Sequence, residues 1–318
     1  HDVAVSGVIS IPNGAPPPGG WPVISWAHGT TGNAPQCAPS NFTKENEEQV
    51  LLDRWVARGF VIVQTDYEGE GTPGLHPYFA SVSGAHDTID IVRAARHLDP
   101  NVSDRWVAMG HSEGGTVALF VASLAGAWAP ELHFLGAVAY APGSDIPDFF
   151  GAMTLNQQPT PMLALLGMMI EGIASADPRV DLKNVLTPKG IALLPSLQSA
   201  CAGSLMHSAE WSTISPAEIF QPGARSSALM QDFIANEPSQ QHLRYPVLIE
   251  QGTNDLTVPY EDSDILRSSF CHNGSRVELN GVAGASHDSV MALSFDGVSS
   301  WIADRFAGKP FNGNCPAG

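Results

Sequence analysis

The residues best suited to chemistry form a short segment flanked by glycines, Gly110-His111-Ser112-Glu113-Gly114, which fits the pattern G-x-S-x-G. An apolar run at 106–109 precedes it and a helix-like stretch follows, so Ser112 is predicted to lie on a strand-to-helix turn. Both glycines are needed there, because a Cβ at either position would crowd the turn. Such a turn exposes the serine hydroxyl beside the positive end of a helix. The segment predicts a nucleophilic serine, and a helix-capping serine is the alternative.

A serine hydroxyl becomes a strong nucleophile only when a base removes its proton and an acid orients that base. Asp255 and His287 each follow a late predicted strand, and the carboxyl ends of parallel strands meet at one edge of a sheet. The order Ser112, Asp255, His287 is that of the α/β-hydrolases. Asp66 and Asp145 also follow predicted strands, and Asp145 is the stronger rival for the role of the acid.

Acyl chemistry also needs hydrogen-bond donors for the oxyanion that develops on the substrate. One predicted donor is the backbone N–H of Glu113, directly after the serine. The other is expected in the loop His28-Gly29-Thr30-Thr31-Gly32, which follows a predicted strand at 23–27. We choose Thr30, with Thr31 as the alternative.

The elements that must position these residues alternate between strand-like and helix-like segments, which predicts an α/β fold with a mostly parallel sheet. Strands are predicted at 3–11, 23–27, 60–65, 106–109, 135–140, 247–250 and 277–279, and helices at 45–58, 85–98, 114–125, 260–269 and 289–306. Residues 146–243 show helical stretches such as 162–173 but no convincing strand. We therefore expect one core, 1–145 and 244–318, interrupted by a helical cap at 146–243.

Composition excludes several classes of function. The chain has 318 residues with a net charge of −17, so it would repel nucleic acid and anionic membranes. Its longest apolar run, 162–170, is about half of the ~20 residues that a bilayer span needs. No Cys/His set has the spacing of a metal site, so we expect no metal and no cofactor. The acidic segment 261–264 is interpreted as a helix start rather than a calcium site.

Cys37, Cys201, Cys271 and Cys315 allow three pairings if all are bridged, and four free thiols are the alternative. The low charged fraction, 15%, and the many turn residues, 31 Gly and 25 Pro, favour an exported protein with two disulfides. A first residue that is not Met is consistent with a signal peptide that has been removed.

Finer details resemble the secretory lipase family. They are an interval of 32 residues from Asp255 to His287 and the segments Cys37-Ala38-Pro39-Ser40, Asp66-Tyr67-Glu68-Gly69, Ser123-Leu124-Ala125 and Ala129-Pro130-Glu131-Leu132. The resemblance covers nearly the whole chain and implies an α/β-hydrolase fold and a secreted serine lipase or esterase. It also implies a cap and flap over an acyl pocket, and the pairs Cys37–Cys201 and Cys271–Cys315.

The expected activity is hydrolysis of small-molecule or lipid esters through an acyl-enzyme. A peptidase or amidase, an acyltransferase, and a fold used only for binding are the alternatives. Methionine and leucine side chains of the cap could form a pliable apolar lining, or they could only pack the cap itself: Met153, Met162, Leu163, Leu165, Leu166, Met168 and Met169.

Overall fold

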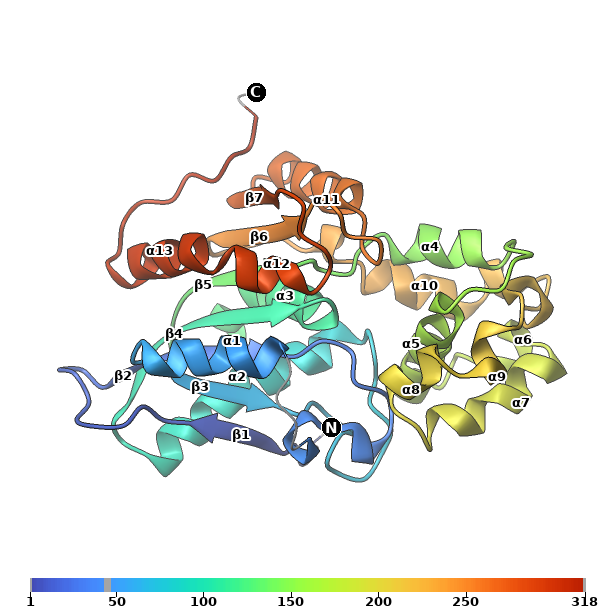
Figure 1. Ribbon diagram of the computed structural model, residues 1–318, viewed down its shortest axis with the longest axis horizontal. Helices are drawn as coiled ribbons and strands as arrows, with labels where there is room; N and C mark the ends of the chain where they lie inside the picture. The colour runs from blue at the N-terminus through green and yellow to red at the C-terminus, as the bar shows by residue number, and fades with distance from the viewer. Residues whose placement is uncertain (1, 43–46, 317–318) are drawn as a thin grey trace.

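A seven-stranded sheet lies at the centre of the computed structural model, which describes residues 2–42 and 47–316. Its strand order is β1-β3-β2-β4-β5-β6-β7; β1 is antiparallel to β3 and the other neighbours are parallel (Figure 1). The strands are β1 (Gly7–Ser10), β2 (Trp21–Ala27), β3 (Val61–Thr65), β4 (Val102–His111), β5 (His133–Tyr140), β6 (Val247–Gly252) and β7 (Val277–Val282). This arrangement confirms the predicted α/β class with a mostly parallel sheet.

Alternation along the strands divides the core into two layers, one on each face of the sheet. In β3, Val61 and Val63 contribute to one apolar cluster and Ile62 to the other. The first cluster includes residues of α2 (Ser81–Leu98), α3 (Glu113–Trp128) and α11 (Tyr260–His272). The second includes residues of α1 (Glu47–Ala57), α12 (Ser289–Leu293) and α13 (Phe295–Phe306). Both faces are therefore covered by helices, as a buried parallel sheet requires.

Helix boundaries differ from the prediction at several places. Helix α3 runs from Glu113 to Trp128 and α11 ends at His272, where helices at 114–125 and 260–269 are predicted. The helix predicted at 289–306 is interrupted at Ser294, whose hydroxyl donates to the carbonyl of Val290 and competes with regular helix geometry. Helix α2 begins at Ser81, four residues before the predicted start. The predicted helix 45–58 is seen from residue 47 to residue 57, and its first two residues lie outside the described ones.

Residues 146–243 contain none of the strands of the central sheet, and their one β pairing is an isolated bridge between Leu186 and Phe220. We call this segment the helical group. It lies at the end of the sheet toward which the parallel strands point (Figure 1). Its interior is a separate apolar cluster that includes Leu163, Leu166 and Met168. Its helices are α4 (Ile146–Met153), α5 (Met162–Ala176), α6 (Leu182–Val185), α7 (Pro188–Leu197), α8 (Ala202–Met206), α9 (Ala209–Ser212) and α10 (Ala228–Ala235).

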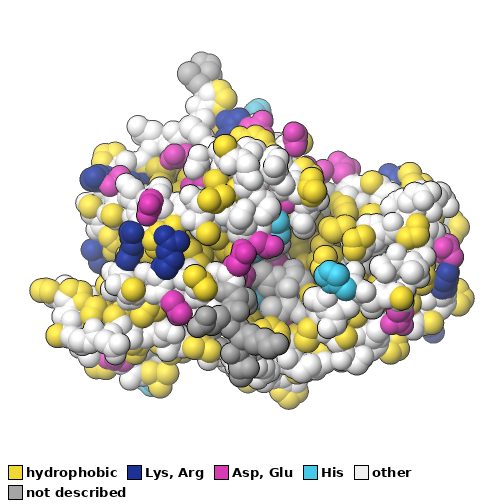
Figure 2. Space-filling model, in the orientation of Figure 1, with side chains coloured by type: hydrophobic (Ala, Val, Ile, Leu, Met, Phe, Trp, Pro, Cys, Tyr) yellow, Lys and Arg dark blue, Asp and Glu magenta, His cyan; other side chains and the backbone are white. Residues whose placement is uncertain are grey.

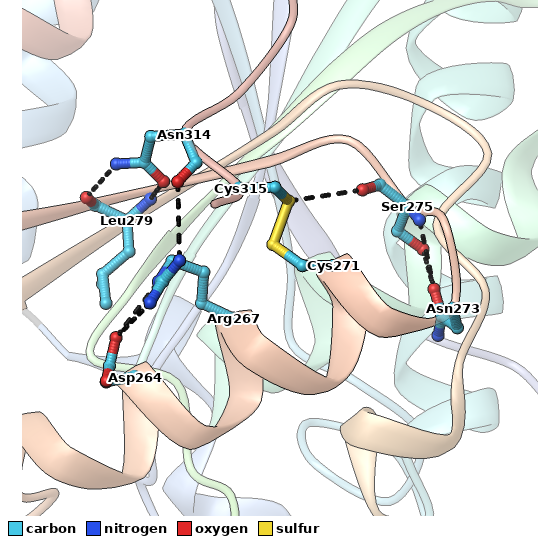
Figure 3. The surroundings of a disulfide bond; sticks show 8 residues. All are labelled: Asp264, Arg267, Cys271, Asn273, Ser275, Leu279, Asn314 and Cys315. Atoms are coloured by element: carbon cyan, nitrogen blue, oxygen red, sulfur yellow. Dashed lines mark hydrogen bonds and ion pairs between the residues drawn. A yellow bond between two sulfur atoms is a disulfide. The ribbon is translucent and has the colours of Figure 1, made fainter. Parts of the chain in front are cut away.

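Two disulfides join Cys37 to Cys201 and Cys271 to Cys315, the pairs that the family resemblance implies. The first connects the loop after β2 to the residue before α8 in the helical group. The second connects the last turn of α11 to the C-terminal segment (Figure 3). There, Asn314 also exchanges two hydrogen bonds with the backbone of Leu279 in β7. The two disulfides therefore attach the helical group and the C-terminal segment, whose described residues contribute no strand to the sheet, to the rest of the molecule.

Candidate active site

Ser112 lies between the end of β4 and the start of α3 with φ 56° and ψ −115°, a strained conformation for a residue with a side chain. A Cβ at Gly110 would overlap the backbone of Gly114, and one at Gly114 would overlap the carbonyl of Ala27. The two glycines therefore permit the turn that presents the serine hydroxyl, which is the physical reason for the G-x-S-x-G pattern.

The structure brings the three predicted residues together at the carboxyl edge of the sheet. The Nε2 atom of His287 lies 3.0 Å from the Oγ atom of Ser112. The Nδ1 atom of His287 lies 2.8 Å from the Oδ2 atom of Asp255. The side chain of Asp255 is fully buried, whereas that of His287 keeps 15% exposure. An unbroken series of hydrogen bonds thus runs from a buried carboxylate through an imidazole to a hydroxyl.

Every oxygen of the Asp255 carboxylate faces a donor. Oδ1 accepts the backbone N–H groups of Thr257 and Val258, and Oδ2 accepts Nε2 of Gln251 as well as His287. Burial alone would raise the pKa of Asp255, but the hydrogen bond and charge of His287, with the two N–H groups, lower it below its usual value. The carboxylate is therefore ionised at neutral pH. Sequence analysis missed Gln251, since nothing in its local pattern marks it.

The two rival acids have other partners. Asp66 accepts hydrogen bonds from the hydroxyls of Ser6 and Ser40 and from the Ser40 N–H. Asp145 adopts a left-handed conformation, φ 59°, before α4, and its N–H donates to Glu237. Asp255, and neither of these two residues, forms the hydrogen bond to His287.

His111 contacts the backbone of the loop that carries His287. Its Nε2–H donates to the backbone carbonyl of His287 over 2.9 Å. Burial would lower the pKa of His111, but the neighbouring Glu48 carboxylate raises it above its usual value. Glu48 also accepts the N–H of Gly29 over 3.1 Å, so one carboxylate contacts both the elbow and the loop after β2.

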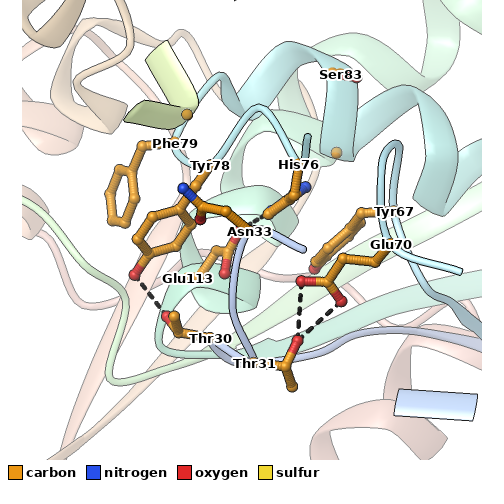
Figure 4. Close-up of polar contacts among 12 residues, drawn as sticks. Thr30, Thr31, Asn33, Tyr67, Glu70, His76, Tyr78, Phe79, Ser83 and Glu113 are labelled. Atoms are coloured by element: carbon orange, nitrogen blue, oxygen red, sulfur yellow. Dashed lines mark hydrogen bonds and ion pairs between the residues drawn. The ribbon is translucent and has the colours of Figure 1, made fainter. Parts of the chain in front are cut away.

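The loop after β2 lies beside the serine because Ala27 pairs with Gly110 in the sheet. The hydroxyl of Thr30 lies 2.5 Å from that of Tyr78, and the hydroxyl of Thr31 donates to both oxygens of Glu70 (Figure 4). Glu70 is fully buried, and burial raises its pKa well above the usual value. It therefore braces the loop and is not a solvated charge.

The side chain of Glu113 forms a buried pair with His76. Its carboxylate lies 2.7 Å from Nε2 of His76, whose Nδ1–H donates to the carbonyl of Glu68. Burial would lower the pKa of His76, but the charge and hydrogen bond of Glu113 raise it to about 9. Glu113, the residue after Ser112, is therefore fixed through its side chain, and its backbone N–H lies at the start of α3.

Other features of the described chain carry no comparable chemistry. Glu261 and Asp262 lie in the first turn of α11, as expected for a helix start.

Over residues 2–42 and 47–316, no three His, Cys, Asp or Glu side chains gather as a metal site would require. In the same ranges, no helix combines the length and the apolar character needed to cross a bilayer. A groove of about 1360 Å³ along α2 includes none of the three central residues.

The sheet order, the strained serine turn and the positions of Asp255 and His287 after late strands define an α/β-hydrolase fold. Candida antarctica lipase A has the same fold: its X-ray structure superposes with a TM-score of 0.80 at 18% identity and covers 98% of this chain and 76% of that one. The predicted fold class is thereby confirmed.

The family model named Secretory lipase matches residues 38–314, and the chain belongs to that family. Two similar proteins are the secreted triacylglycerol lipases LIP5 and LIP6 of Malassezia globosa, 22% and 26% identical over 89% and 92% of this chain. The chain spans 63% and 54% of the length of these two relatives. The secretory family and the two disulfides confirm the predicted extracellular location.

Proposed function

We propose that this chain is a serine hydrolase that cleaves carboxylic esters through an acyl-enzyme. The observation that carries the proposal is the series of hydrogen bonds Asp255–His287–Ser112, which ends on a serine in a strained strand-to-helix turn. Membership of the secretory lipase family supports esters, rather than amides or other acyl compounds, as the substrate class. The reaction needs no metal and no cofactor.

The proposed reaction has two halves. In the first, Oγ of Ser112 forms a bond to the ester carbonyl carbon while Nε2 of His287 takes the hydroxyl proton. The oxyanion is bound by the backbone N–H groups of Glu113 and Thr30. Collapse breaks the bond to the leaving oxygen, which takes the proton from His287 and departs as the alcohol. In the second half, His287 removes a proton from water, and the hydroxide adds to the acyl carbon. Collapse then breaks the bond to Oγ of Ser112, which takes the proton back from His287, and the carboxylic acid is released.

Each partner of the serine has a defined task in this scheme. Asp255 holds the imidazole of His287 in the tautomer whose Nε2 can accept a proton, and its charge stabilises the imidazolium. The charge is maintained because three donors besides His287 face the carboxylate. The bond from His111 to the backbone of His287 restricts the loop that carries the base.

We also propose that residues 146–243 form a cap over the acyl group of the substrate, on a core of residues 1–145 and 244–318. On the face shown in Figure 2, hydrophobic side chains gather where the surface is hollowed between the helical group and the rest of the molecule. Such a surface suits the apolar acyl part of an ester. The buried methionines of α5, Met168 and Met169, lie in the apolar cluster inside the helical group, so in this proposal they pack the cap itself.

Replacing Ser112 by Ala tests the proposal. We expect turnover of p-nitrophenyl butyrate and covalent labelling by a fluorophosphonate to disappear, with the thermal midpoint close to that of the wild type. Ser269→Ala is the matched control, because the hydroxyl of this half-buried serine on α11 has one hydrogen-bond partner among the described residues, the carbonyl of Ile265. Turnover retained in Ser112→Ala would contradict the proposal. An amide analogue and an added alcohol acceptor, measured in parallel, separate esterase from amidase and acyltransferase activity.

A further inference from the structure

The hydroxyl of Thr30 has a single partner among the described residues, the hydroxyl of Tyr78 at 2.5 Å. A phenol is a stronger acid than an alkyl alcohol, so the Tyr78 O–H donates and Oγ1 of Thr30 accepts. Burial, with the nearby charge of Glu113, raises the pKa of Tyr78 well above its usual value, and the phenol keeps its proton at every working pH. The hydrogen of the Thr30 hydroxyl is then left for another acceptor.

The neighbouring threonine cannot take this role. Its hydroxyl donates to the Glu70 carboxyl at 3.0 and 2.8 Å, so Thr30 and Thr31 turn to different partners (Figure 4). Thr30 is half-buried, whereas its partner Tyr78 is only 1% exposed. Of the two residues, only Thr30 therefore keeps exposed surface that a substrate could contact.

Tyr78 is itself held rigidly by α5. A Cβ at Gly172 of this helix would overlap the backbone and the Cβ of Tyr78, so the two segments are in the closest contact that a glycine permits. The side-chain amide of Asn33, at the end of the loop that carries Thr30, donates to the carbonyl of Met168 and to Glu171 of the same helix. One helix thus supports both the loop and the phenol that bonds to it.

Resting on the proposed ester hydrolysis, we propose that the Thr30 hydroxyl is a third oxyanion donor and that Tyr78 is the positioning residue that aims it. The position fits, since Thr30 follows Ala27 by three residues and Ala27 pairs with Gly110 beside the serine turn. A hydroxyl that already accepts a hydrogen bond is also a stronger donor. Thr30 then supplies its backbone N–H and its side chain, and Tyr78 acts only through it.

The test compares Thr30→Val, Thr30→Ser and Tyr78→Phe. Thr30→Val keeps the shape and the backbone N–H but removes the hydroxyl, and we expect kcat to fall roughly 10²-fold with KM little changed. Thr30→Ser, which keeps the hydroxyl, should retain most of the activity. Tyr78→Phe should lower kcat about tenfold, the loss equivalent to one neutral hydrogen bond. The double variant Thr30→Val/Tyr78→Phe should be no slower than Thr30→Val alone.

Tyr245→Phe is the matched control, because its ring packs against Phe134 at the start of β5, the opposite end of the sheet from the serine turn, and its kcat should equal that of the wild type. Affinity for a boronic acid, which mimics the tetrahedral intermediate, should fall in parallel with kcat for Thr30→Val and Tyr78→Phe. Wild-type kcat in Tyr78→Phe, multiplicative losses in the double variant, or a Thr30→Ser variant as slow as Thr30→Val would overturn the inference. If Ser112→Ala abolishes turnover while Tyr78→Phe is silent, only this inference fails. If Ser112→Ala retains turnover, the proposed function fails with it.

Discussion

At the scale of single residues, the carboxylate of Asp255 is surrounded on all sides by donors. Two backbone N–H groups face Oδ1, and Gln251 and His287 face Oδ2. If asparagine replaced Asp255, its NH₂ group would face hydrogen-bond donors whichever way the amide was turned, because donors face both oxygen positions of the carboxylate. The site is therefore built for an ionised acid, not for a polar side chain in general.

Asp255→Asn is expected to lower kcat by roughly 10³–10⁴-fold, because an amide cannot hold the imidazole of His287 in its working tautomer. The variant should also be less stable, because donors that bonded to the carboxylate would now face the NH₂ group of the new side chain. Ester turnover and the thermal midpoint measure the two effects. Asp145→Asn serves as the control: asparagine tolerates the left-handed conformation at that position, and both quantities should stay near the wild type. A loss of activity confined to Asp145→Asn would show that the acid has been assigned to the wrong residue.

At the scale of secondary-structure elements, the helical group and the loop after β2 are linked at several points. The Cys37–Cys201 disulfide joins them, and the N–H of Ala202, next to Cys201, donates to the carbonyl of Thr31. Asn33 adds the contact with α5. Movement of the helical group would therefore be transmitted to the loop that carries the proposed oxyanion donor.

Removal of the Cys37–Cys201 bridge by paired Ser substitutions should lower both stability and kcat. The stability loss is expected to be about 2–5 kcal/mol, typical of a native disulfide. The kcat loss follows from release of the loop that holds Thr30 and Thr31. Removal of Cys271–Cys315, which attaches the C-terminal segment to α11, should cost stability in the same range without lowering kcat. Urea unfolding and ester turnover of both variants decide the matter, and equal kcat losses in the two would refute the link.

At the scale of the whole molecule, several buried ionisable groups shift stability in the same direction with pH. Burial raises the pKa of Asp87 to about 7 and that of Glu250 to about 8. The pKa of His76 is raised to about 9, because Glu113 outweighs the effect of burial. In each case the folded state holds its proton more tightly than the unfolded state. The net charge of −17 adds self-repulsion that grows as further carboxyls ionise.

The free energy of unfolding is therefore expected to fall as the pH rises from about 4.5 to about 9. A group with a raised pKa contributes its full stability below its unfolded value, and that contribution is lost as the pH passes the folded value. For Glu250 this window runs from 4.5 to about 8 and for His76 from 6.5 to about 9. Urea titrations at pH 5, 7 and 9 measure the slope. Glu250→Gln should make the dependence of stability on pH less steep, because glutamine does not titrate but can still accept the hydrogen bond from Asn280. A free energy of unfolding that rises across this pH range would contradict the expectation.

Much of the fold and of the candidate site can be predicted from the sequence. Strand and helix periodicity are local properties, and the turn around Ser112 requires glycines at fixed offsets, so both can be read from neighbouring residues. Chain order then limits which residues are candidates for the acid and for the base, because a parallel sheet brings the carboxyl ends of its strands to one edge. Asp255 and His287 could be singled out for that reason, although Asp145 satisfied the same rule.

Only the tertiary structure decided which of the permitted partners meet. Asp255 rather than Asp145 contacts His287, and Thr30 and Thr31, adjacent in the chain, turn to Tyr78 and to Glu70. The same holds for the buried pair of His76 and Glu113, 37 residues apart in the chain. Contacts of this kind depend on how helices and loops pack against each other. A single sequence carries no local pattern that specifies such packing, whereas the burial of each polar group requires that it find a partner.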